Sequence, residues 1–331
     1  MRVLIINSTY GGVSGSGRHV QQLVEALRDR VKFELWNINT VGCLDFPKLR
    51  SISFYLKCKM KGCPDDIDVI HIHNPKFAGL CREGHVNVLT IHGDYKTELK
   101  LKYGRLAKPV ILYIDRQVRK ANVITTVSPY WAKLRGWRWI PNMIDLRKVE
   151  KIPPSAESYI LFVGRDDPIK NYPLFRELAK RAYKELGVKS LALGPLKENT
   201  EYLKHNRVPW KQVVSYMKSA YALVITSKQE GFPTTILEAW ASGCPVVAHN
   251  IPPLVALAEE CPGSMLLFNN AGGALKALKS LGENYVRENL VKKAREHVKR
   301  FDVRVVAEQY YRLYRGLVEV SNEGWRARCN L

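Results

Sequence analysis

The stretch 221–250 constrains the fold most strongly, because strand, loop, helix and strand patterns follow one another there without interruption. Tyr221–Thr226 (YALVIT) and Pro245–Ala248 (PVVA) are short apolar runs typical of buried strands, and Thr234–Ser242 has helical composition and spacing. This order predicts parallel strands joined by a crossover helix, the repeating unit of an α/β fold. Ligands of such folds bind beyond the carboxyl ends of the strands, where the loop 227–233 lies.

Two carboxylates mark this loop and helix. Glu230 is at the tip of the loop, and Glu238 lies one turn inside the helix. Between them, Thr234 and Thr235 offer backbone N–H groups at a helix N-terminus, which favours an anion. The arrangement suits a ligand with a phosphate in the middle and hydroxyls at both ends, and a sugar nucleotide is such a ligand.

The full string EGFPTTILEAWASGCPVVA resembles the E-x7-E signature of retaining glycosyltransferases, notably family 4, which have the GT-B fold. The resemblance implies two Rossmann-like parallel-sheet domains that face each other across a cleft. It also implies that Glu238 accepts hydrogen bonds from the ribose diol, and that Glu230 holds donor-sugar hydroxyls and steadies the cationic sugar. The donor-binding residues that it implies in this stretch are Glu230, Gly231, Phe232, Pro233, Thr234, Thr235 and Glu238.

A second loop carries the same resemblance. GRDDPIKN follows the predicted strand Tyr159–Val163 and is similar to the family's G-R-x4-K, with Asn171 where glycine is usual. Arg165 and Lys170 are then implied to grip the donor diphosphate, Arg165 as a planar fork and Lys170 as a point charge. Because these cations replace a metal ion at the leaving group, we expect neither a metal nor another cofactor.

In the first half of the chain, the strand Arg2–Asn7 is followed by a glycine-rich turn and a helix, without a G-x-G-x-x-G fingerprint. Within the resemblance this turn corresponds to the family's Gly-Gly loop. Either Gly11–Gly12 or Ser14–Gly17 fills that role, and the GRHV that follows directly favours Gly15 and Gly17 as donor-binding residues.

His92 ends the predicted strand Asn87–Ile91 and precedes a glycine. It resembles the histidine of the family's T-x-H-G motif, which contacts the donor sugar, so a catalytic role is implied. The alternative is a core histidine that is hydrogen-bonded to backbone.

Two other patterns could suggest a metal, but neither predicts one. Asp66-x-Asp68 precedes the strand Val69–His73 and therefore lies at the amino end of a parallel sheet, away from the ligand edge. His71 and His73 share a strand face, but no carboxylate stands at a matching spacing.

The 331 residues predict two domains with one core each. We expect an acceptor domain at 1–149, a donor domain at 150–301 with a linker at Pro153–Ser155, and a helix at 302–331 that returns to the first domain. Ile140–Asp145 resembles the family's interdomain Pro-Asn-Gly-Ile-Asp loop, with Met143 in place of glycine.

The net charge of +21 indicates an anionic partner, and the excess of positive charge is concentrated in the first half. Phe46–Lys61 has no acidic residue, and helical spacing places Leu49, Ile52, Ser53, Leu56 and Met60 on one face. The basic residues on both flanks of that face are Lys48, Arg50, Lys57, Lys59 and Lys61. This layout is typical of a helix that lies on an anionic membrane, and Tyr95–Lys120 is a second basic region. The alternative is a surface helix packed on its own sheet.

The seven cysteines are scattered and include no CxxC pair, which favours a reduced, intracellular protein. MRVLIIN has too short an apolar run for a signal peptide. We therefore expect a cytoplasmic protein, peripheral on the inner face of the membrane.

Together these patterns predict a retaining, metal-independent glycosyltransferase that uses a nucleotide sugar and an acceptor hydroxyl, on a lipid or a lipid-linked glycan. One alternative is a sugar-nucleotide 2-epimerase of the same fold, which incubation without acceptor would reveal. Another is a non-catalytic, basic nucleic-acid-binding protein. RRM, KH and zinc-finger patterns do not occur in the sequence, so no nucleic acid is expected as a partner.

Overall fold

The computed structural model describes residues 1–12, 14–46, 49–196 and 199–329, and the chain divides into two compact units. Unit 1 is Met1–Asn142 with Val303–Leu331, and unit 2 is Met143–Asp302. The boundary predicted at residue 149 lies inside a short helix of unit 2, α7 (Leu146–Glu150). The predicted linker at 153–155 is likewise part of unit 2.

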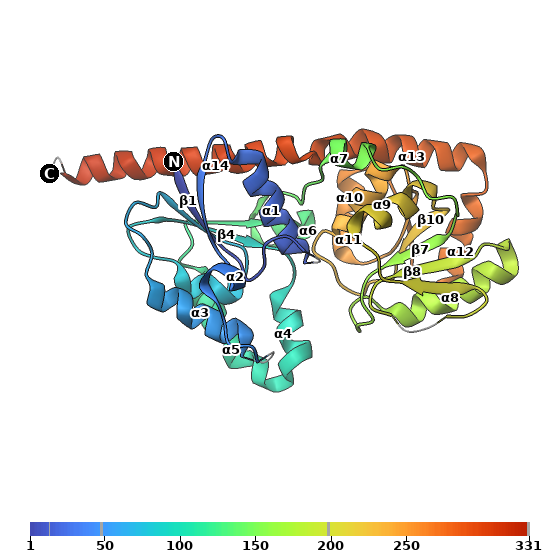
Figure 1. Ribbon diagram of the computed structural model, residues 1–331, viewed down its shortest axis with the longest axis horizontal. Coiled ribbons are helices and arrows are strands. Elements are labelled where there is room, and N and C mark those ends of the chain that lie inside the picture. The colour runs from blue at the N-terminus through green and yellow to red at the C-terminus, as the bar shows by residue number, and fades with distance from the viewer. Residues whose placement is uncertain (13, 47–48, 197–198, 330–331) are drawn as a thin grey trace. The chain divides into compact units, whose positions relative to one another are not determined.

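Unit 1 is built on a parallel sheet of six strands in the order β2-β1-β3-β4-β5-β6 (Figure 1). The strands are β1 (Arg2–Ile6), β2 (Lys32–Trp36), β3 (Val69–Ile72), β4 (Val86–Ile91), β5 (Val123–Thr126) and β6 (Arg138–Trp139). β1, β3 and β4 are almost continuously apolar and buried, as expected for parallel strands covered by helices on both faces.

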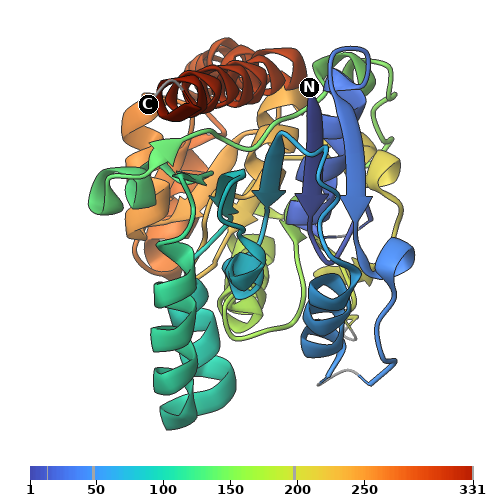
Figure 2. The ribbon, with the colours of Figure 1, turned by 90° about the vertical axis from the view of Figure 1, so that its left-hand side faces the viewer.

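The helices of unit 1 form the two covering layers. They are α1 (Gly15–Leu27), α2 (Ile38–Val41), α3 (Arg50–Lys61), η1 (Pro75–Leu80), α4 (Tyr95–Tyr103), η2 (Gly104–Leu106), α5 (Ala107–Val118), α6 (Pro129–Arg135) and α14 (Val303–Cys329). Side chains from α3, η1 and α5 share one core with Ile70 and Ile72 of β3. His71, which points to the other face, contacts α14, and α14 packs against α1. The α4 and α5 helices lie side by side and project from the rest of unit 1 (Figure 2).

Unit 2 contains the second six-stranded parallel sheet, in the order β12-β11-β10-β7-β8-β9. Its strands are β7 (Ile160–Val163), β8 (Ser190–Leu193), β9 (Leu203–Asn206), β10 (Ala222–Ile225), β11 (Val246–His249) and β12 (Leu266–Phe268). This is the doubly wound order in which the direction of winding reverses between β7 and β10. Ligands of such sheets bind at that reversal, outside the carboxyl ends of the two strands.

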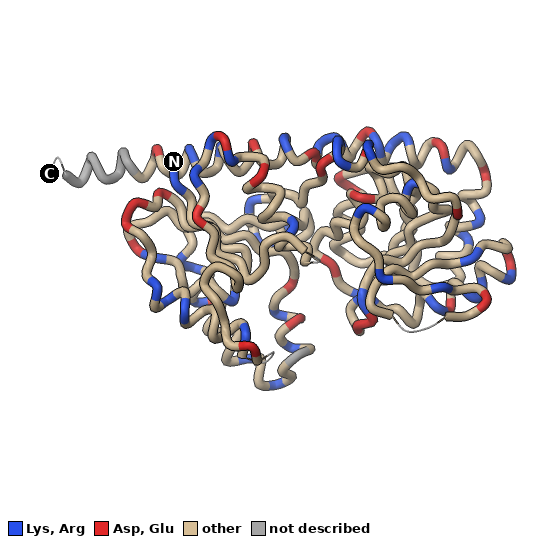
Figure 3. The backbone as a smooth tube through the Cα atoms, viewed as in Figure 1, with Lys and Arg blue, Asp and Glu red and all other residues tan. Residues whose placement is uncertain are grey.

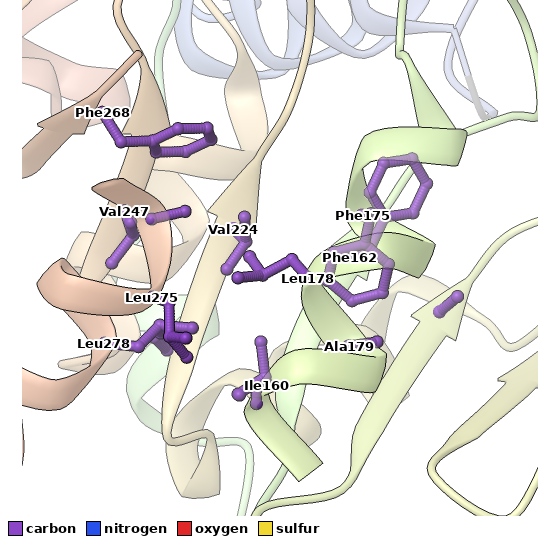
Figure 4. Close-up of a cluster of buried hydrophobic side chains, with 14 of the residues drawn as sticks. Ile160, Phe162, Phe175, Leu178, Ala179, Val224, Val247, Phe268, Leu275 and Leu278 are labelled. Atoms are coloured by element: carbon purple, nitrogen blue, oxygen red, sulfur yellow. The ribbon is translucent and has the colours of Figure 1, made fainter. Parts of the chain in front are cut away.

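The other helices of unit 2 are α8 (Tyr172–Leu186), α9 (Trp210–Ser219), α10 (Thr234–Ser242), α11 (Pro252–Glu260), α12 (Ala271–Ser280), α13 (Asn284–Val298) and η3 (Lys299–Phe301). The α8 and α12 helices cover one face of the sheet, where Phe175, Leu178 and Leu275 pack on Ile160 and Val224 (Figure 4). Two parallel-sheet α/β domains, as predicted from the sequence, are therefore confirmed.

Candidate active site

Two loops meet at the reversal point of the unit 2 sheet. One follows β7 and spans 164–171, and the other follows β10 and spans 226–233. The Thr226 hydroxyl donates to the Lys170 carbonyl, and the Lys228 N–H donates to the Ile169 carbonyl, both at 2.8 Å. The two loops that carry the predicted motifs therefore hold each other in place.

Lys170 and Glu230 form an ion pair between these loops, with 2.5 Å from Nζ to Oε1. The Ser227 hydroxyl donates to the same carboxylate oxygen at 2.6 Å. The Glu230 side chain is 10% exposed, so this pair is more shielded from water than an ordinary surface pair. A cation and a carboxylate predicted to act on one ligand thus lie in direct contact.

Arg165 occupies a different position in the same loop. Its side chain is 75% exposed and pairs with Asp167 at 3.1 Å. The guanidinium is therefore not part of the Lys170–Glu230 pair, and it stands in solvent at the carboxyl end of β7.

The turn that ends this loop depends on an unusual backbone. Asn171 has φ 51° and ψ 49° and, among the described residues, is the single non-glycine with positive φ. Asparagine tolerates this left-handed region better than most residues, which explains how it replaces the glycine of the family pattern. Met143, the other departure from the family's glycines, keeps a negative φ and is buried.

The α10 helix begins at Thr234, directly after the second loop. Pro233 occupies the N-cap position, and no side chain caps the helix there. The N-terminal dipole of α10 therefore faces the loop that carries Glu230. Phe232 is buried against the Phe301 ring, so it packs in the interior rather than facing a ligand.

Glu238 is buried within α10, at 3% exposure. Its Oε1 accepts a hydrogen bond of 3.0 Å from the Trp210 indole N–H, at the start of α9. The sequence patterns did not indicate Trp210, because it belongs to no recognised motif and lies 28 residues away.

In unit 1, His92 is one of four histidines that gather at the carboxyl edge of the sheet. His92 Nε2 and His73 Nδ1 are 3.2 Å apart, and the His19 ring centre lies 5.1 Å from that of His92. The His71 and His73 rings are in contact, tilted with their centres 3.9 Å apart, so they do share one face of the sheet. Spacing alone did not reveal this cluster, since His19 comes from α1.

These rings are held in a buried polar network. His71 contacts the Tyr314 hydroxyl at 2.6 Å and the Thr90 hydroxyl at 2.7 Å. His19 Nδ1 lies 3.0 Å from Asn142 Oδ1. Burial lowers the pKa of His19 to about 4. Burial and repulsion from the neighbouring imidazoles lower the pKa values of His71, His73 and His92 well below the usual range. All four rings are therefore neutral at physiological pH.

The glycine-rich turn lies close to this edge. Gly17 is buried, and a β-carbon there would lie 2.4 Å from the Gly11 carbonyl oxygen. Gly17 therefore has to be glycine for packing. Gly11 and Gly12 adopt positive φ, while Gly15 is exposed at the first position of α1.

The acidic pair at the amino end of β3 is engaged within the fold. Arg2 pairs with Asp66 through its guanidinium, and its backbone N–H donates to Asp68 at 2.7 Å. Within the described ranges, no group of three or more His, Cys, Asp or Glu side chains is arranged to hold a metal ion.

The predicted basic helix begins at Arg50 rather than Phe46. Phe54, Cys58 and Ser53 face the core, so Ser53 does not belong to the exposed stripe. Leu49, Ile52, Leu56 and Met60 are all exposed, and Met60 reaches 86%. Arg50, Lys57, Lys59 and Lys61 are exposed beside them, and blue segments mark the basic positions along α3 in Figure 3. Lys48 lies outside the described residues.

Comparison with known proteins agrees with this geometry. The chain matches the family "Glycosyl transferases group 1" over residues 144–297 and "Glycosyltransferase Family 4" over residues 13–148. It is 26% identical to the phosphatidyl-myo-inositol mannosyltransferase of Mycolicibacterium smegmatis over an alignment 353 positions long, gaps included, which covers 92% of this chain and 90% of that protein.

Solved structures share the fold. A sucrose-phosphate synthase from Thermosynechococcus elongatus superposes with a TM-score of 0.75 at 18% identity, covering 96% of this chain and 99% of the other. Anabaena Alr3699/HepE in complex with UDP and glucose superposes with a TM-score of 0.71 at 15% identity. The superposition covers 96% of this chain and 100% of the other.

Two doubly wound sheets with a Lys–Glu pair at a reversal point define a glycosyltransferase of the GT-B fold. The family matches make the assignment more specific, and the chain belongs to the group 1, family 4 type of glycosyltransferases.

Proposed function

We propose that this enzyme transfers a sugar, with retention of configuration and without a metal ion, from a nucleoside-diphosphate sugar to an acceptor hydroxyl. The contact between Lys170 and Glu230 carries the proposal, because it sets a cation beside a carboxylate at the ligand edge of unit 2. The Anabaena neighbour binds UDP and glucose, which supports a nucleotide-sugar donor.

The proposed chemistry breaks the bond between the anomeric carbon and the diphosphate, so negative charge develops on the leaving group. Lys170 and the N-terminus of α10 stabilise that charge, because both are fixed before the reaction starts, and Arg165 adds a second cation from the same exposed loop. The acceptor oxygen bonds to the anomeric carbon on the face from which the diphosphate departs, and its proton passes to a diphosphate oxygen. Glu230 holds the sugar, and Glu238 holds the ribose.

Binding and transfer can be tested in sequence. A thermal-shift panel of UDP-, GDP- and ADP-sugars should single out one base, since a tight ligand raises the unfolding temperature by mass action. Transfer with that donor should persist in EDTA, and the product should keep the anomeric configuration of the donor by NMR. Restoration of lost activity by Mn²⁺ or Mg²⁺ would refute the metal-free assignment, and an inverted product would refute retention. An altered donor in the absence of acceptor would indicate the epimerase instead.

We further propose that the acceptor is a lipid or lipid-linked glycan, reached at an anionic membrane on the cytoplasmic side. The relative from Mycolicibacterium smegmatis is named for transfer to phosphatidyl-myo-inositol. None of the helices in the described part of the chain combines the length and apolar character needed to cross a bilayer. The proposed membrane contact is made by the surface of the fold.

Unit 1 offers such a surface along α3 and α5. Both helices pack on η1, and Tyr55 and Tyr113 join them through hydroxyls 3.3 Å apart. The exposed apolar side chains of α3, α5 and the segments next to them are Phe46, Leu49, Ile52, Leu56, Met60, Leu101, Leu106, Val110, Leu112 and Tyr113. A soluble partner would have to cover an unusually apolar face, whereas a bilayer accepts apolar side chains and basic flanks together.

The membrane proposal predicts binding to phosphatidylglycerol-containing vesicles but not to pure phosphatidylcholine, weakening as salt rises. Each well-placed cation contributes about 1 kcal/mol, so replacing Lys57, Lys59 and Lys61 with glutamate should abolish binding. Reversal of Lys180, Lys184 and Lys189 in unit 2 makes the same change in charge and should leave binding intact. Equal binding to both vesicle types, or equal loss in both triple variants, would contradict a membrane role for α3.

A further inference from the structure

Trp210 stands at a position that its packing alone does not explain. It is the first residue of α9 and follows the carboxyl end of β9, on the ligand edge of the unit 2 sheet. The α9 and α10 helices pack against each other, as their neighbouring positions in Figure 1 show. The half-buried indole therefore reaches from one helix to the carboxylate of the next.

The hydrogen bond between Trp210 and Glu238 can run in one direction only, from the indole to the carboxylate. The indole Nε1–H can only donate, and it lies 3.0 Å from Glu238 Oε1. Glu238 is 3% exposed, and a buried carboxylate is stable in the fold only where donors surround it. Trp210 is a rigid donor, so it restricts the orientation of the carboxylate plane more tightly than a flexible side chain or a water molecule would.

We propose that Trp210 is a positioning residue that holds Glu238 in the orientation needed to accept hydrogen bonds from the ribose 2′- and 3′-hydroxyls. The inference rests on the proposed function, in which Glu238 binds the ribose. It adds a residue that belongs to no motif of the family resemblance. It also has a chemical consequence: Trp210 contributes to binding only when the nucleotide carries the diol.

That consequence separates positioning from two simpler roles. If the indole stacked on the base or only filled space, its removal would weaken binding of ribonucleotides and dideoxynucleotides alike. If it acts through Glu238, its removal weakens binding of the ribonucleotide and leaves binding of the 2′,3′-dideoxy analogue unchanged.

The experiment measures Kd by calorimetry for the nucleoside diphosphate that wild type binds best, and for its 2′,3′-dideoxy counterpart. Trp210→Phe keeps a ring and removes the donor, so it should weaken ribonucleotide binding roughly tenfold and leave dideoxynucleotide binding unchanged. Trp210→Phe should have no further effect in a Glu238→Ala background.

Trp240→Phe provides the matched control. The Trp240 indole also donates a 3.0 Å hydrogen bond, but to the Ser264 carbonyl. Its loss should lower stability while leaving the ratio of the two Kd values as in wild type. Should Trp210→Phe fail to fold, the indole N–H resonance of Trp210 in wild-type protein should still shift with the ribonucleotide and not with the dideoxy analogue.

Equal weakening of both nucleotides by Trp210→Phe, an unchanged ribonucleotide Kd, or an indole resonance that responds equally to both would overturn the inference. In each of those cases wild type still binds the nucleotide, so the proposed function stands. Absence of any nucleoside diphosphate binding by wild type would instead overturn the proposed function, and the role of Trp210 with it.

Discussion

Acidification from about pH 7 to about pH 5 should destabilise unit 1. His19, His71, His73 and His92 stay neutral in the folded state because burial lowers their pKa values, and repulsion from neighbouring imidazoles lowers those of His71, His73 and His92 further. In the unfolded chain each regains the ordinary value of 6.5. The unfolded state therefore binds more protons, and stability falls as the pH drops below that value.

The size of the effect follows from proton linkage. Between about pH 7 and about pH 5, each histidine that titrates only in the unfolded state removes about 2 kcal/mol of folding free energy. Four such residues together remove about 8 kcal/mol, which is comparable with the whole stability of a typical domain. The hydrogen bonds and packing around the four rings therefore have to contribute enough folding free energy at neutral pH to offset this loss.

Urea unfolding followed by circular dichroism over this pH range should show the loss. Replacing His73 with glutamine removes one titrating ring, so the slope of unfolding free energy against pH should decrease by up to about 1.4 kcal/mol per pH unit. His85→Gln changes a unit 1 histidine outside the cluster and should leave the slope as in wild type. A flat stability of unit 1 between these pH values, or identical slopes for His73→Gln and wild type, would refute the reasoning.

Three further predictions concern unit 2. Lys170→Ala should lower turnover roughly 100-fold, because it removes the cation at the leaving group, and a loss below about fivefold in steady-state assays would contradict that role. Glu238→Ala should weaken binding of the nucleoside diphosphate, whereas Glu230→Gln should mainly lower kcat; equal loss of nucleotide binding in both variants would contradict the division of roles. Asn171→Ala should lower the free energy of unfolding of unit 2 by about 1 kcal/mol while Asn171→Gly leaves it nearly unchanged, and equal effects in chemical denaturation would rule out the backbone explanation.

Local patterns predicted where the two loops of unit 2 meet, since their residues lie in continuous motifs. GRDDPIKN and EGFPTTILE each follow a strand of a parallel sheet, so both loops had to meet at its carboxyl edge. The contact between Lys170 and Glu230 then needs only the adjacency of β7 and β10. The conformation of Asn171 could not be predicted as the meeting of the two loops was, because the family pattern has glycine there.

Contacts between segments that are far apart in the chain could not be predicted from the sequence. The histidine cluster draws on α1, β3 and β4 and is closed by Tyr310 and Tyr314 of α14, some 220 residues or more from Thr90 and His71. A single strand pattern at His71-x-His73 shows that two rings share a face, but not which helix covers them. The helical wheel of 46–61 likewise identified an apolar stripe, yet the core is filled by Phe54 and Cys58 instead.

The neutrality of the histidines, which makes unit 1 sensitive to acid, also determines where His92 carries its proton. Because His73 and His92 are both uncharged, the 3.2 Å contact between His73 Nδ1 and His92 Nε2 holds a single proton. If His73 carries it, the remaining proton of His92 is on Nδ1, and that nitrogen is a hydrogen-bond donor. If His92 carries it, Nδ1 is an acceptor instead. His73 therefore decides whether His92 presents a donor or an acceptor at Nδ1.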